Sequence, residues 1–156
     1  MSEDTRGFDF SPAEQRALAR VLDAIIPPSD DGRLPGAGEL GVARYLEGAV
    51  QKTPELRPVI AAGLAAADAL ARGRGADGFA ALSAADARDV LNELATREPA
   101  FLPGLVFHTY AGYYQHDRVF EALGLEARPP HPKGYETEAN DLTLLDPVRR
   151  RRRLYR

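Results

Sequence analysis

Apolar residues recur every three or four positions along most of this chain, in segments that prolines and glycines separate. The first segment opens with Ser11-Pro-Ala-Glu14, which has the form of a capping box with proline at the first helical position. The apolar residues that follow at helical spacing are Leu18, Val21, Leu22 and Ile25. Pro27-Pro28 then ends the segment. The pattern predicts an amphipathic helix over residues 12–26.

The same combination of helix starts, apolar spacing and helix breakers predicts the remaining elements. We expect helices over about residues 38–52, 54–72, 83–98, 100–115 and 117–123. No stretch alternates polar and apolar residues in the way a strand does, and the sequence contains no repeat. The expected fold class is therefore all-α, a bundle of five to six helices with an extended irregular C-terminal tail.

The chain divides into three parts. Residues 1–10 are expected to be a flexible N-terminus, residues 11–126 a helical domain, and residues 127–156 an extended, proline-containing, arginine-rich tail. Gly48 and Gly63 lie inside expected helices, where glycine costs about 1 kcal/mol relative to alanine. Close approach of a neighbouring helix is the expected reason for both glycines.

Composition limits the kinds of site that the chain can hold. Its length of 156 residues suits one domain with its own core. The absence of cysteine excludes disulfides, thiolate zinc sites, iron–sulfur ligation and c-type haem attachment. No apolar run approaches the roughly 20 residues of a membrane helix, so we expect no membrane insertion. The first residues are acidic and lack the apolar core of a signal peptide. The expected location is cytoplasmic; a periplasmic one would require export with a partner, or a leader that this sequence lacks.

Charge is distributed unevenly along the chain. Residues 1–126 carry a net charge of −7, whereas residues 127–156 carry +4. Arg149, Arg150, Arg151, Arg152 and Arg153 form an unbroken run. Such a run fits a solvated end or an intramolecular contact, docking to an acidic protein surface, or nucleic-acid binding. Nucleic acid is the least favoured partner because the folded body is acidic.

Two motifs suggest a cofactor or metal at first sight. Residues 73–78 spell G-x-G-x-x-G, but this dinucleotide fingerprint requires a preceding strand, and here it follows an alanine-rich segment. We interpret it as a link between helices. The histidines are His108, His116 and His131, and the first two are about 12 Å apart along a helix axis, too far for one metal. No nucleophile with its base stands out. We therefore expect no catalytic residue, cofactor or metal in this chain.

The segment 100–115 is the most informative one. Its aromatic residues fall around the whole circumference of the expected helix, and such a helix must be covered on all sides. Either it lies at the centre of the bundle, or part of it contacts another protein. His108 is expected to be packed and hydrogen-bonded, with a role at a partner's active site as the alternative.

Several stretches together resemble the gluconate 2-dehydrogenase subunit 3 family, the small or gamma subunit of membrane-associated sugar and sugar-acid dehydrogenases. One is the segment from Ser11 to Pro27, with its Ile-Ile-Pro end. The others are Phe79-Ala-Ala-Leu-Ser83, His108 with Gly112-Tyr113-Tyr114, Val119-Phe120 with Leu123-Gly124, and Pro129-Pro130 with Gly134-Tyr135. The resemblance covers about residues 11–135.

The resemblance implies a non-catalytic small subunit that binds and stabilises a large flavoprotein of the glucose–methanol–choline type. FAD is then expected in the partner subunit, and a cytochrome subunit is a further implied partner. We do not expect enzyme activity from the chain alone. The residues expected to bind the partner are His108, Tyr110, Tyr113, Tyr114, Gly134, Tyr135 and the arginines 149–153.

Two other functions stay open from the residues alone. The chain could bind nucleic acid or an acidic surface through its arginine-rich tail. It could also be an enzyme by itself, with a site around His108 and Tyr110.

Overall fold

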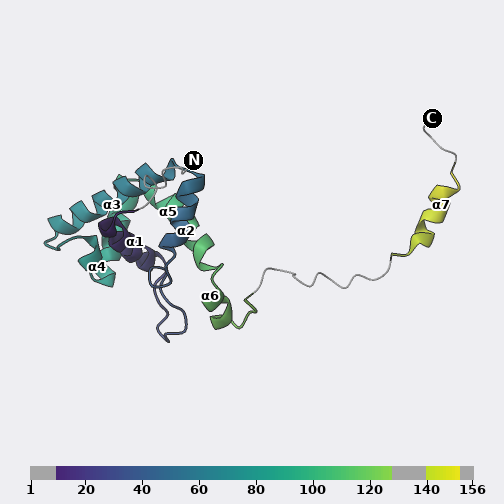
Figure 1. The fold of residues 1–156 in the computed structure, drawn as a ribbon, viewed down its shortest axis with the longest axis horizontal. Helices are drawn as coiled ribbons and strands as arrows, with labels where there is room; N and C mark the ends of the chain where they lie inside the picture. The colour runs from purple at the N-terminus through teal and green to yellow at the C-terminus, as the bar shows by residue number, and fades with distance from the viewer. Residues whose placement is uncertain (1–9, 128–139, 152–156) are drawn as a thin grey trace, which may run out of the picture.

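A computed structural model of the chain describes residues 10–127 and 140–151. The helical domain consists of α1 (Pro12–Ile25), α2 (Ala43–Lys52), α3 (Leu56–Gly73), α4 (Ala84–Arg97), α5 (Phe101–Tyr113) and α6 (Asp117–Ala122), with a 3₁₀ helix η2 (Phe79–Ala81) before α4. Figure 1 shows these helices packed around one another as a bundle. The described residues contain no strand, so the expected all-α class is confirmed.

Boundaries differ from expectation in two places. The second helix begins at Ala43 rather than near residue 38, since the preceding residues form turns and Gly41 has a φ of 79°. Within the tail, η3 (Leu142–Leu145) and α7 (Asp146–Arg149) are short helices where we expected irregular backbone. The carboxylate of Asp141 caps the first by accepting from the backbone N–H of Thr143.

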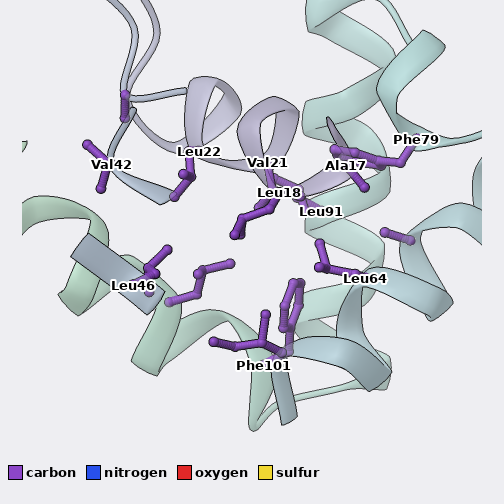
Figure 2. Close-up of a cluster of buried hydrophobic side chains, with 14 of the residues drawn as sticks. Ala17, Leu18, Val21, Leu22, Val42, Leu46, Leu64, Phe79, Leu91 and Phe101 are labelled. Atoms are coloured by element: carbon purple, nitrogen blue, oxygen red, sulfur yellow. The ribbon is translucent and has the colours of Figure 1, made fainter. Parts of the chain in front are cut away.

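Helix α1 provides the centre of the core. Its Leu18, Val21 and Leu22 are completely buried, and α1 contacts α2, α3, α4, α5 and η2. In Figure 2 these side chains point toward Leu46 of α2 and toward the pair Leu64 and Phe101. One amphipathic stripe, readable from the sequence, is thus the surface on which the other helices assemble.

Local hydrogen bonds hold the start of α1 against α3. Ser11 and Glu14 form the expected capping box, in which the Glu14 carboxylate accepts from the Ser11 N–H at 2.8 Å. The same carboxylate pairs with Arg57 of α3 at 2.9 Å. The Arg57 guanidinium also lies 4.7 Å from the ring centre of Phe10, which is buried. Phe10, which we assigned to the flexible N-terminus, therefore belongs to the core.

The loop between α1 and α2 folds back onto α1. The backbone N–H of Gly38 donates to the Asp23 carboxylate at 2.7 Å, and a Cβ on Gly38 would overlap the carbonyl oxygen of Ala19. Farther out, Arg33 donates to the carbonyl of Ala122 at 2.7 Å. The loop and α6 accordingly project from the same end of the bundle in Figure 1.

The two helical glycines have different surroundings. A Cβ on Gly63 would overlap the ring of Phe101, so close approach explains this glycine, as expected. A Cβ on Gly48 would meet nothing within 4 Å, so the expected close approach is wrong there.

We predict that Gly63→Ala destabilises the fold by about 1–3 kcal/mol, because the added methyl must displace the buried Phe101 ring. The matched variant Gly48→Ala should stabilise it by up to about 1 kcal/mol, since the helix gains a better helix former in open space. Urea unfolding of both variants measures the difference. Similar stabilities for the two would contradict this packing.

A second prediction concerns pH. Burial raises the pKa of Glu14, but hydrogen bonds from Ser11 and Arg57 outweigh it, so the pKa lies below the ordinary value of 4.5. The ionised carboxylate therefore stabilises the fold above pH 4.5, and this contribution is lost as pH falls through the lower folded-state pKa.

Glu14→Gln keeps the shape and capping ability of the side chain but removes its charge. It should cost about 0.5 kcal/mol at pH 7, a cost that shrinks toward zero in acid. Urea unfolding at a series of pH values checks this, with exposed Glu121→Gln as the control. A cost independent of pH would argue against the ion pair.

Candidate partner-binding surface

Helix α5 has two apolar faces with different surroundings. Phe101, Leu105, Thr109 and Tyr113 are buried in the bundle, and the Thr109 hydroxyl donates to the Leu105 carbonyl at 2.6 Å. The opposite side is open: Phe107 is 67%, Tyr114 49% and Tyr110 46% exposed. The described residues thus bury one face of the helix and leave the other face partly exposed, so α5 does not lie at the centre of the bundle.

We call Phe107, Tyr110 and Tyr114 the aromatic face. Their positions at i, i+3 and i+7 place them on one stripe of α5. The rings of Tyr110 and Tyr114 stack at 6.0 Å. Exposed Val106 extends the stripe. A contiguous exposed patch rich in tyrosine and phenylalanine has the composition of a protein–protein contact.

Tyr113 does not belong to this face. It is buried, and its hydroxyl donates to the carbonyl of Pro35 in the α1–α2 loop at 2.8 Å. Burial raises the pKa of Tyr113, with smaller contributions from Tyr114 and Glu39. Its expected contact with a partner does not fit this position, because the side chain joins α5 to the loop.

His108 lies between Tyr45 of α2 and Phe107, with ring centres 6.2 and 5.2 Å away. Its Nδ1 is buried and has no hydrogen-bond partner among the described residues. The expected packing is present, but the expected hydrogen bond is missing at Nδ1.

A pocket of about 290 Å³ opens beside His108. Its other lining residues come from α2 and the residue after it: Arg44, Tyr45, Gly48, Ala49, Lys52 and Thr53. We did not predict this pocket from the sequence. The spacing of Arg44, Gly48 and Lys52 by four residues is the signal that could have indicated a cationic groove with an open centre.

The other candidate residues have structural positions or lie outside the described part. His116 caps α6, with Nδ1 accepting from the Arg118 N–H at 3.3 Å. The G-x-G-x-x-G segment joins α3 to η2, as expected, and Gly75 and Gly78 have positive φ. His131, Gly134, Tyr135, Arg152 and Arg153 lie outside the described residues.

Arg149, Arg150 and Arg151 are exposed. Arg149 lies 3.4 Å from the Asp146 carboxylate in the same short helix. The structure therefore shows three of the five arginines at the surface.

Within residues 10–127 and 140–151, no group of three or more histidine, aspartate or glutamate side chains is arranged to hold a metal ion. None of the helices there combines the length and apolarity needed to cross a bilayer.

The described residues thus form an all-α domain that exposes an aromatic helix face. The sequence model of one family, Gluconate 2-dehydrogenase subunit 3, matches residues 12–127. The chain belongs to this family, and the resemblance seen in the sequence is confirmed. Searches of curated proteins and of solved structures found no match.

We predict that Tyr113→Phe destabilises the fold by about 1–3 kcal/mol, since the buried Pro35 carbonyl loses its donor. Tyr114→Phe removes a hydroxyl from the exposed neighbour and should change stability by less than about 0.5 kcal/mol. Thermal and urea unfolding of the two variants test this. Equal effects would mean that the hydrogen bond to the loop contributes nothing.

Proposed function

We propose that this chain is a non-catalytic small subunit that binds and stabilises an FAD-dependent sugar or sugar-acid dehydrogenase of the glucose–methanol–choline type. Family membership supports a role as a subunit of a dehydrogenase. In this proposal the large subunit holds FAD and oxidises the substrate hydroxyl, and a cytochrome subunit takes the electrons. In the same proposal, this chain contributes no cofactor and offers a surface that the large subunit binds.

The aromatic face is the observation that carries the proposal. Burying a side chain such as that of Phe107 contributes about 1.5–3 kcal/mol, so an exposed row of such residues favours association. Tyrosine fits this place because its ring is apolar and its hydroxyl remains able to hydrogen-bond at the edge of a contact. Aromatic residues also dominate the energetics of many interfaces.

The arginine-rich tail is the proposed second contact. Arginine pairs with carboxylates through two parallel hydrogen bonds, so a run of arginines suits an acidic partner surface. The body of this chain is itself acidic. Residues 127–156 carry the opposite net charge, so they would attract an acidic partner surface that the body repels.

Co-purification tests the proposal. Tagged chain, expressed in its native cells, should retain a large subunit that contains FAD, identified by flavin absorbance and fluorescence. Isolated large subunit should unfold at a lower temperature than the complex, because ligand binding to the native state stabilises it. Recovery of the chain without any flavoprotein would refute the proposal.

The contact itself is tested by substitution. The double variant Phe107→Ser with Tyr110→Ser should weaken binding to the large subunit about 30-fold or more, since it removes two exposed anchors. Val59→Ser removes a partly exposed apolar residue of α3 and should leave the affinity unchanged. Circular dichroism verifies that both variants fold. Native affinity of the aromatic variant would exclude this face as the contact.

A further inference from the structure

The pocket beside His108 carries positive charge that the fold does not use. Arg44 and Lys52 stand on α2 on either side of Gly48, and neither forms an ion pair with a described residue. Most of the other arginines of the domain do have such partners; Arg57, Arg74 and Arg97 pair with Glu14 or Glu93. These two cations stand eight residues apart on α2, about 12 Å along the helix axis. A negative group bound between them would be attracted by both.

His108 of α5 also lines the pocket. Its Nδ1 has no hydrogen-bond partner among the described residues, but this atom has almost no exposed surface, so a group in the pocket does not reach it. The positive charge of the pocket therefore comes from Arg44 and Lys52, and His108 contributes ring surface.

Gly48 explains why the pocket exists. Glycine is unfavourable inside a helix, and close packing does not require it here, because a Cβ at Gly48 would meet no atom within 4 Å. Any larger side chain at position 48 would project into the space between Arg44 and Lys52. The glycine therefore keeps the centre of the groove open.

The pocket also continues the aromatic face. Phe107 of that face packs edge-on against His108, and His108 contacts the half-exposed Tyr45. One partner surface could cover both regions at once. This continuity favours an occupant that belongs to the same protein as the aromatic contact.

We propose that the pocket receives the carboxylate of an aspartate or glutamate side chain of the flavoprotein partner, paired with Arg44 and Lys52. The inference rests on the proposed function, because that partner is the large subunit. A carboxylate matches both cations, and exclusion of water by the adjoining aromatic contact strengthens such a pair. The pocket would thus set the register of the two chains.

The sharpest test fills the pocket without disturbing the fold. Gly48→Leu places a side chain where the structure has open space, so the helix should remain folded. Its affinity for the purified FAD-containing subunit should fall about 30-fold. Gly73→Leu is the matched control: it lies at the end of α3, also without neighbours, and should bind within about twofold of the native chain.

Charge is tested separately with Arg44→Gln and Lys52→Gln together. This variant should bind more weakly at low salt and lose part of the salt dependence of the native complex. If Gly48→Leu and this variant both bind like the native chain, the pocket inference is wrong and the proposed function stands. If no flavoprotein binds the native chain, both fail.

A free small carboxylate is the competing occupant. Titration of the isolated full-length chain with glutarate, followed by NMR of the His108 ring, examines it. Saturable binding tighter than about 1 mM would assign the pocket to a free anion and overturn the partner carboxylate. Weaker or absent binding, together with the affinity loss of Gly48→Leu, supports the partner carboxylate.

Discussion

Burial of one face of α1 against four other helices is the constraint on which the rest of the structure depends. Leu18, Val21 and Leu22 have no exposed surface, so α2, α3, α4 and α5 must all direct apolar residues toward this one stripe. Helix α5 packs against this assembly with one face only. An outer helix with a second apolar face is then left with aromatic rings in solvent.

The two faces of α5 differ in their surroundings. Leu105, Thr109 and Tyr113 hold the helix in place, and Tyr113 fastens it to the α1–α2 loop through Pro35. Phe107, Tyr110 and Tyr114 make no comparable contribution to the core. A helix that is apolar all round is unusual for an isolated domain, but it is expected where the second face meets another chain.

Local signals in the sequence were sufficient to predict the helices of the domain, but not to predict which face of each helix is buried. The capping box at Ser11 and the spacing of the residues after it define α1 because these interactions are made within a few residues. On α5 no polar stripe distinguishes inside from outside, so Tyr113 and Tyr114 could not be told apart. The same holds for Gly63 and Gly48, because only the placement of Phe101 makes one of them necessary. The pocket beside His108 forms where α2 and α5 pack together, and a local sequence pattern does not indicate which helices pack together.

The separation of core from surface has a consequence for how such a subunit can act. The residues proposed to contact the partner are neither capping residues nor members of the α1 core, so the bundle can fold before the partner arrives. Arg44 and Lys52 cost the free chain little, since both side chains remain hydrated in an open groove. The exposed aromatic rings are different, because apolar surface in water is unfavourable and its burial is favourable. In the proposed complex, burial of these rings would recover the free energy that their exposure costs the isolated fold, and this gain would favour association.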